Sequence, residues 1–354
     1  MRKTFNGIQQ IGIGVTDAKA VFNWYRKNLG FDILVFKDES KATLMTRYTG
    51  DVVQDRYAML AMNMTGGGGL EIWQFKTRKP KPPNRTILLG DLGIHTMKVR
   101  CHDVSKAFQS LRHLPNVDLG EICASPLGIP NLLFKDPWNN TVQLVQDDYA
   151  FDTCKAPCGG VLGAIIGVSD MKRSICFYTQ ILDYDIIADD RSNIFNDFSK
   201  IAGGENQFRR VLLKHSNRKV GGFGELLGPT EIELVQALDR NPFKIYKDRL
   251  WGDLGYIHLC FDVQGMQLLR DEANALSHPF TVDSANSFDM GDAAGHFSYI
   301  EDPDGTLIEF VETHRVPILK KLGLFINHQK RNSSKPLPRW LVKAMRVHRV
   351  TKDI

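Results

Sequence analysis

The chain has 354 residues, of which 43% are hydrophobic and 24% are charged, an ordinary composition for a folded protein of roughly two domains. No apolar run reaches about 18 residues and the N-terminus lacks a signal-peptide core, so the sequence predicts neither a transmembrane helix nor secretion. Six cysteines in a chain of this length give no dense disulfide framework, and we expect a reduced, cytoplasmic protein.

Charge is distributed unevenly along the chain. The formal net charge is +5, but residues 313–354 hold eleven Lys/Arg and one Asp, so this tail carries +10 and the remaining chain −5. A mildly acidic body is not typical of a nucleic-acid-binding protein, so no nucleic-acid partner is predicted.

Four segments repeat one order of predicted elements, which is a strand, a helix and three further strands. Asp17 and Asp170 are predicted N-caps of two of the helices. The first strands are expected at 8–15, 94–99, 162–168 and 257–263. The last strands are expected at 69–75, 141–146, 230–236 and 306–312.

The two halves of the chain resemble each other. Residues 11–34 align with residues 164–187 at an offset of 153. Two further pairs follow in the same order, GDLGIH with GDLGYIH and FKDPWNNTVQLVQ with YIEDPDGTLIEFV. We interpret the chain as an ancient duplication. The predicted units are a first domain at 1–150, a second domain at 151–312 and the basic tail at 313–354.

Polar residues that can bind a metal recur at equivalent places in these apolar strands. A lone buried His or Glu is more often a hydrogen-bonded core residue than a ligand, so the argument depends on the recurrence. The last strands carry Glu71, Gln143, Glu233 and Glu309. The first strands carry Gln10, His95, Gly163 and His258, of which only the glycine offers no ligand atom.

The order of these residues resembles that of the vicinal oxygen chelate family, which includes glyoxalase I, methylmalonyl-CoA epimerase, extradiol dioxygenases and bleomycin-resistance proteins. The resemblance covers roughly residues 6–312 and is clearest in QQIGIGVTD, LEIWQF, GYIHLCFDV and EDPDGTLIEFVE. It implies an α+β fold in which four βαβββ modules pair into two curved half-barrel sheets. It also implies up to four ligands for one metal site in each pair.

Carried over to this sequence, the resemblance implies two candidate metal sites. The favoured site lies in the second half, because two carboxylates and one imidazole leave coordination positions open to water and substrate. Its ligands would be Glu233, His258 and Glu309. A weaker second site would use Gln10, Glu71, His95 and Gln143. The expected cofactor is one divalent ion, which could be Zn, Ni, Mn, Co or Fe(II).

The predicted function is that of a metal-dependent enzyme acting on a small oxygenated substrate. Proton abstraction next to a metal-chelated carbonyl, as in an isomerase or lyase, is favoured, with Glu309 or Glu233 as base. His296 and Tyr299 are candidate substrate contacts. The alternatives are an extradiol ring-cleavage dioxygenase, since YIEDPDGTLIE resembles the end of that signature, and a metal-free binding protein of the bleomycin-resistance type.

The basic tail has two interpretations. Residues 317–327 and 336–350 could form short amphipathic helices. They would pack on the acidic body or on a second copy in a homo-oligomer. Alternatively, they would bind an anionic membrane surface.

Overall fold

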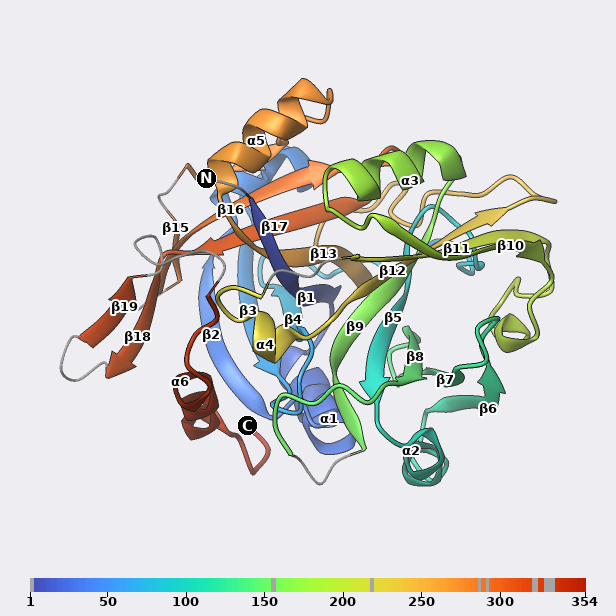
Figure 1. Ribbon diagram of the computed structural model, residues 1–354, viewed down its shortest axis with the longest axis horizontal. Coiled ribbons are helices and arrows are strands. Elements are labelled where there is room, and N and C mark those ends of the chain that lie inside the picture. Colours follow the sequence, from blue (N-terminus) through green and yellow to red (C-terminus); the bar gives the residue numbers. More distant parts are fainter. Residues whose placement is uncertain are drawn as a thin grey trace.

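The computed structural model describes residues 3–153, 157–216, 220–285, 288–290, 293–319, 324–327 and 335–354. Two large curved sheets dominate the protein, with short helices around them (Figure 1). The predicted α+β fold of βαβββ modules in two half-barrel sheets is confirmed. Within the described ranges, no helix is long and apolar enough to cross a membrane.

Each module starts with a long strand and a helix. Module 1 contains β1 (Thr4–Gly14), α1 (Ala18–Leu29), β2 (Ile33–Lys41), the 3-10 helix η1 (Thr43–Tyr48), β3 (Asp55–Met62) and β4 (Gly69–Phe75). Module 2 contains β5 (Gly93–Cys101), α2 (Val104–Leu111), β6 (Asp118–Ala124), β7 (Pro130–Lys135) and β8 (Thr141–Gln146). Module 3 contains β9 (Cys158–Gly167), α3 (Met171–Gln180), β10 (Ile186–Asn193), η2 (Asn196–Phe198), β11 (Phe208–Lys214), α4 (Gly224–Leu227) and β12 (Glu231–Ala237). Module 4 contains β13 (Gly255–Gln264), α5 (Met266–Ala275), β14 (Val282–Asp283), β15 (Phe288–Met290), β16 (Ala293–Glu301) and β17 (Leu307–Thr313).

Local sequence explains where the module helices begin. Asp17 accepts a hydrogen bond from the backbone N–H of Ala20 at 3.0 Å, and Asp170 caps α3 in the same way, as predicted. Helix α1 ends at Gly30, whose φ of 78° suits glycine. Its buried face has helical spacing and consists of Ala18, Val21, Phe22, Tyr25 and Leu29.

The sheets pair modules in an order that the sequence does not predict. In the outer sheet, modules 1 and 4 combine in the order β14-β16-β17-β13-β1-β4-β3-β2, with β15 paired to β16. In the inner sheet, modules 2 and 3 combine in the order β10-β11-β12-β9-β5-β8-β7-β6. In each sheet the two modules meet at an antiparallel pair of their first strands, β1–β13 in the outer sheet and β5–β9 in the inner sheet. The two sheets therefore do not coincide with residues 1–150 and 151–312.

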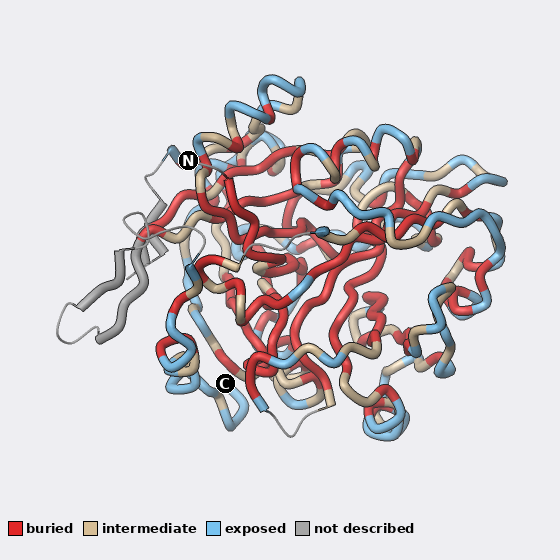
Figure 2. Tube along the Cα trace, in the orientation of Figure 1, coloured by how far each residue is buried: buried red, intermediate tan, exposed pale blue. Residues whose placement is uncertain are grey.

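Modules that are adjacent in sequence still contact each other, but through helices. Tyr25 of α1 donates a hydrogen bond to Asp136 of module 2 at 2.7 Å. Tyr178 of α3 donates an equivalent bond to Asp302 of module 4 at 3.1 Å. Side chains from both sheets and from α1, α2, α3 and α5 form one continuous apolar core. Figure 2 shows buried residues along the strands and exposed residues on the outer faces of the helices.

The tail forms two different structures. The helix predicted at 317–327 is wrong where the chain is described, because β18 (Arg315–Leu319) and β19 (Leu324–Asn327) pair as antiparallel strands. Residues 320–323 of that prediction lie outside the described residues. The expected helix within 336–350 is present as α6 (Arg339–Lys343) and the 3-10 helix η4 (Ala344–His348). It packs on the body through Leu337, Leu341 and Val342.

Candidate metal centre

Four central strands of the outer sheet bring together four polar side chains that can bind a metal. We call this group the outer cluster. The ligand atoms of its His and two Glu lie within 4.8 Å of one another. The cluster consists of Gln10 of β1, Glu71 of β4, His258 of β13 and Glu309 of β17.

The imidazole of His258 lies at the centre of the cluster. Its Nε2 is 3.0 Å from an oxygen of Glu309 and 3.2 Å from an oxygen of Glu71. The amide nitrogen of Gln10 lies 3.3 Å from Glu71 and 3.5 Å from Glu309. Glycine at position 12 makes room for the ring, because a Cβ there would lie only 2.4 Å from Cε1 of His258.

The charges of the outer cluster favour a cation at its centre. Burial alone lowers the pKa of His258, but the carboxylates of Glu309 and Glu71 outweigh burial and raise it to about 10. A divalent ion would balance both carboxylates and bind Nε2 in place of that proton. Among the described residues, Oε1 of Gln10 has no hydrogen-bond partner. Because an amide can rotate its oxygen and nitrogen, Gln10 can present this oxygen as a fourth ligand, so the donor set fits a divalent metal.

Aromatic side chains cover one side of the cluster. The hydroxyl of Tyr299 lies 3.4 Å from Nδ1 of His258, so this predicted residue does lie next to the cluster. Burial and the charges of Glu309 and Glu71 raise the pKa of Tyr299 well above 10, so the phenol stays protonated. Trp251 stacks along His258 with ring centroids 6.3 Å apart, and Trp73 packs against Trp251.

The predicted grouping of Glu233 with His258 and Glu309 is wrong. Glu233 lies on β12 of the inner sheet, whereas the other two residues lie on the outer sheet. There Glu233 is ion-paired with Lys98 and Arg210. The outer cluster instead takes two ligands from each predicted site.

The predicted second site is not assembled either. Ile165 is the equivalent of Gly12 at the offset of 153 residues. Gly12 is paired with His258 in the register of β1 against β13, and Ile165 is paired with Thr96 in the register of β5 against β9. Thr96, rather than His95, is therefore the inner-sheet equivalent of His258. His95 lies at the register irregularity between Ile94 and Thr96, where its Nδ1 is 2.7 Å from the hydroxyl of Thr96, while Gln10 and Glu71 lie on the other sheet. The sequence alignment missed this shift because GDLGYIH is one residue longer than GDLGIH.

His296 is not part of the outer cluster. It lies on β16 three residues before Tyr299, so the two side chains face opposite sides of the sheet. Its Nε2 is hydrogen-bonded to Asp283 at 2.5 Å and lies 3.3 Å from the hydroxyl of Ser298. The structure therefore separates His296 from the outer cluster, and its contact with substrate stays a prediction.

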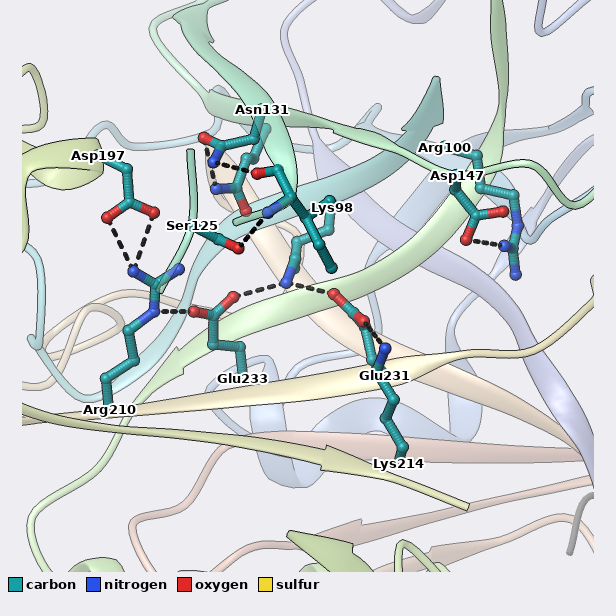
Figure 3. A network of polar contacts seen from close by, with 12 residues as sticks. Lys98, Arg100, Ser125, Asn131, Asp147, Asp197, Arg210, Lys214, Glu231 and Glu233 are labelled. Atoms are coloured by element: carbon teal, nitrogen blue, oxygen red, sulfur yellow. Dashed lines mark hydrogen bonds and ion pairs between the residues drawn. The ribbon is translucent and has the colours of Figure 1, made fainter. Parts of the chain in front are cut away.

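The sequence reading also missed a buried network on the inner sheet (Figure 3). Lys98 of β5 contacts Glu231 and lies 2.5 Å from Glu233. Arg210 of β11 contacts Glu233 and lies 2.9 Å from Asp197. Burial alone raises the pKa of Glu233, but Arg210 and Lys98 lower it to about 2, so this carboxylate is ionised. A lysine within the apolar predicted strand IHTMKV was the available signal.

Comparison with known proteins agrees with this architecture. Residues 7–144 match the profile of the Glyoxalase/Bleomycin resistance protein/Dioxygenase superfamily. Glyoxalase I from Zea mays superimposes with a TM-score of 0.54 at 12% identity, covering 88% of this chain and 92% of that one. A dioxygenase candidate from Bacillus subtilis subsp. subtilis str. 168 gives 0.57 at 14% identity, covering 88% and 86%. The chain has the vicinal oxygen chelate fold.

The matched profile covers two of the four vicinal oxygen chelate modules. The sheet order shows that modules 3 and 4 repeat the same arrangement. No curated protein sequence matches the chain. At such low identities the solved structures establish the fold alone, so the function must be argued from the outer cluster.

Proposed function

We propose that the chain is a metal-dependent enzyme that moves a proton next to a carbonyl group of a small oxygenated substrate. The observation that carries the proposal is the convergence of the outer cluster on one point between four strands. Two carboxylates, an imidazole and an amide suit Zn, Ni, Mn, Co or Fe(II). When bound, such an ion would supply Lewis-acid polarisation of a substrate oxygen.

The carboxylates of the outer cluster are the candidate bases. Glu309 and Glu71 both lie against Nε2 of His258, and Glu71 takes the role that the sequence analysis gave to Glu233. Glu309 is the stronger candidate because its carboxylate lies nearer to Nε2 of His258, at 3.0 Å against 3.2 Å for Glu71, and its side chain is less exposed, at 9% against 14%. Deeper burial would strengthen its interaction with a bound cation and its basicity toward carbon.

The aromatic cover supports chemistry on a partly desolvated substrate. Trp73, Trp251 and Tyr299 are each at most 7% exposed and form one apolar cluster beside His258. Such a wall excludes water, and charges interact more strongly where water is excluded. The protonated Tyr299 could also donate a hydrogen bond to a substrate oxygen.

Two alternatives remain as outcomes of the experiment. Dioxygenases are represented in the name of the superfamily, but iron sites of the extradiol kind use two His and one carboxylate. The outer cluster has one His and two carboxylates, which supports proton transfer more than ring cleavage. A metal-free binding protein is the other alternative.

The experiment combines metal analysis with proton exchange. Purified protein is analysed for metal by mass spectrometry and then incubated with a panel of α-hydroxycarbonyl compounds in D₂O. We expect a divalent ion and deuterium incorporation next to the carbonyl, followed by NMR. Glu309→Gln should lower the metal content and slow exchange by about 100-fold or more, because it removes both a ligand and a base.

Glu39→Gln is the matched control, since Glu39 is an exposed carboxylate of the same sheet that pairs with Lys76. It should leave metal content and exchange unchanged. Metal content unaffected by Glu309→Gln would contradict the proposal. Oxygen consumption with a catechol and bound iron would support the dioxygenase instead.

A further inference from the structure

A cavity opens over the inner sheet, away from the outer cluster. Its polar lining comes mainly from Lys98, Asn131, Gln143, Arg210, Glu231 and Glu233, and Leu127 and Leu212 add apolar surface. The space measures about 390 Å³ with its open mouth. It can therefore accept a molecule of a few heavy atoms.

Register relates this cavity to the outer cluster. Gln143 lies opposite Lys98, as Glu309 lies opposite Cys260. Lys98 on the inner sheet is therefore the equivalent of Cys260 on the outer sheet. It follows Thr96, the equivalent of His258, by two residues. Its ammonium group lies 2.5 Å from Glu233, the equivalent of Glu71 (Figure 3). A fixed positive charge thus neutralises Glu233, whereas Glu71, its equivalent in the outer cluster, is proposed to bind a metal.

The buried charges around the cavity balance. Lys98 and Arg210 neutralise Glu233, and Lys214 lies 3.3 Å from Glu231. Although burial opposes its charge, the carboxylates of Glu231 and Glu233 raise the pKa of Lys98, so the ammonium persists. The network contains three cations and three anions: Lys98, Arg210, Lys214, Asp197, Glu231 and Glu233. Asp189, which also lines the cavity, is paired with Arg191 at 2.7 Å. An ionic ligand would meet no excess of opposite charge.

One acceptor in the cavity lacks a donor. Gln143 is 1% exposed, and no described residue donates a hydrogen bond to its Oε1. Its Nε2 donates to Oδ1 of Asn131 at 3.1 Å, and the Asn131 amide nitrogen donates to the carbonyl of Ile129. These two bonds fix Oε1 of Gln143 as the free atom. An unsatisfied buried acceptor is unfavourable, so a ligand that donates to it would be stabilised.

A donor is available on the other side. Lys98 has three N–H groups, and its described partners are two carboxylates. We propose that the inner sheet binds a small uncharged molecule that carries both a hydroxyl and a carbonyl group, without a metal. The hydroxyl donates to Oε1 of Gln143 and the carbonyl accepts from Nζ of Lys98. Leu127 and Leu212 contact its carbon atoms. This site is independent of the proposed reaction at the outer cluster.

Dihydroxyacetone is the probe, and glycerate is its anionic counterpart of similar size. Each is titrated by ligand-observed NMR into full-length protein treated with EDTA. We expect saturable binding of dihydroxyacetone and at least about tenfold weaker binding of glycerate, since the network offers no net positive charge. Gln143→Leu should weaken dihydroxyacetone binding about tenfold, because it removes the acceptor, and should lower the melting temperature, because it leaves Oδ1 of the buried Asn131 without its donor.

Glu309→Gln is the matched variant of the outer cluster and should leave binding unchanged. Leu127→Trp, at an exposed position on the lining, provides a second test that does not disturb the buried network and should also weaken binding. Three results would overturn the proposal: no saturable binding, binding that Gln143→Leu and Leu127→Trp leave intact, or binding that Glu309→Gln abolishes. In the last case the probe occupies the outer cluster.

Discussion

Asp262 is a buried acid on β13 that the proposed chemistry does not use. It is 3% exposed, and its Oδ2 has no hydrogen-bond partner among the described residues. Burial raises its pKa to about 7, and the nearby charge of Glu312 acts in the same direction, although a hydrogen bond with Asn6 opposes it. The folded protein therefore holds a proton here that the unfolded chain releases near pH 4.

This shift has a defined sign. Because the folded state binds more protons between about pH 4 and pH 7, Asp262 makes unfolding easier as pH rises through that window. We predict that Asp262→Asn is more stable than the native protein by about 2–4 kcal/mol above pH 8, and within about 1 kcal/mol of it at pH 4. Urea unfolding at both values measures the difference. A stability difference between the two proteins that is the same at both pH values would refute the raised pKa of Asp262.

Sequence reasoning identified the ligand-type residues but not their partners. Glu71, His258 and Glu309 were recognised because charged or imidazole groups in apolar strands require compensation. Which of them meet depends on the pairing of whole modules, and each module offers the same local pattern. Thr96 and His95 illustrate the remaining difficulty, since a one-residue shift changes which side chain faces the site.

At the scale of elements, the junction of β1 and β13 makes the outer cluster. Gly12 is paired with both His258 and Glu71, so its missing side chain leaves the space that the imidazole fills. Gly163 holds the equivalent place of Gln10 on the inner sheet. A Cβ there would lie 2.1 Å from the carbonyl oxygen of Glu231, so no fourth ligand can be restored at this position.

Gly12 therefore provides a test of the cluster that leaves every ligand in place. Gly12→Ala should displace the His258 ring and lower the metal content of the purified protein at least about tenfold, because second-shell changes commonly have effects of that size. Metal analysis and circular dichroism would distinguish loss of the site from loss of the fold. Glu39→Gln, at an exposed position of the same sheet, is the control for general effects. Full metal occupancy in Gly12→Ala would contradict the assignment.

The junction of β5 and β9 contains two thiols that face each other. Cys101 and Cys158 are register partners, both buried, and both free. The next pair, His102 and Pro157, is hydrogen-bonded at 2.8 Å, which makes the cysteines a non-hydrogen-bonded pair. Such pairs have Cα atoms about 4.5 Å apart, within the range of disulfides.

We predict that prolonged incubation with oxidised glutathione joins Cys101 to Cys158 and releases two molecules of reduced glutathione. Peptide mapping without reductant should detect the crosslink, and the oxidised protein should gain about 2–4 kcal/mol of stability. Burial of both thiols should make the reaction slow. Cys101→Ser, which removes one partner, should show neither effect. A crosslink from Cys101 to any other cysteine would contradict the register.

At the scale of the whole molecule, the C-terminal segment packs against the outer sheet and helix α4 of module 3. Leu341 is 6% exposed and lies in an apolar cluster with Leu60 of the outer sheet and Leu226 of α4. Ion pairs extend the contact, with Arg349 at 3.0 Å from Asp32 and Lys343 at 3.1 Å from Asp152. In Figure 1 this segment lies against β2.

Leu341→Ala should therefore destabilise the protein by about 2–4 kcal/mol, the range for large-to-small changes in a core. Trp340→Ala is a control one residue away, since Trp340 is 67% exposed and should cost less than about 0.5 kcal/mol. Chemical denaturation measures both. Equal effects of the two substitutions would mean that α6 does not pack as described.

The closure of module 1 on module 4 has a consequence for synthesis on the ribosome. Gln10 and Glu309 are 299 positions apart, and β1 cannot complete its sheet until β13 has emerged. At about 5–20 residues per second, the wait is about ten seconds or more. The inner sheet needs no residue beyond Ala237 and can form in the meantime. Nascent chains would thus expose the unpaired edge of β1 during this interval, which makes the first module the segment most exposed to chaperones and to aggregation.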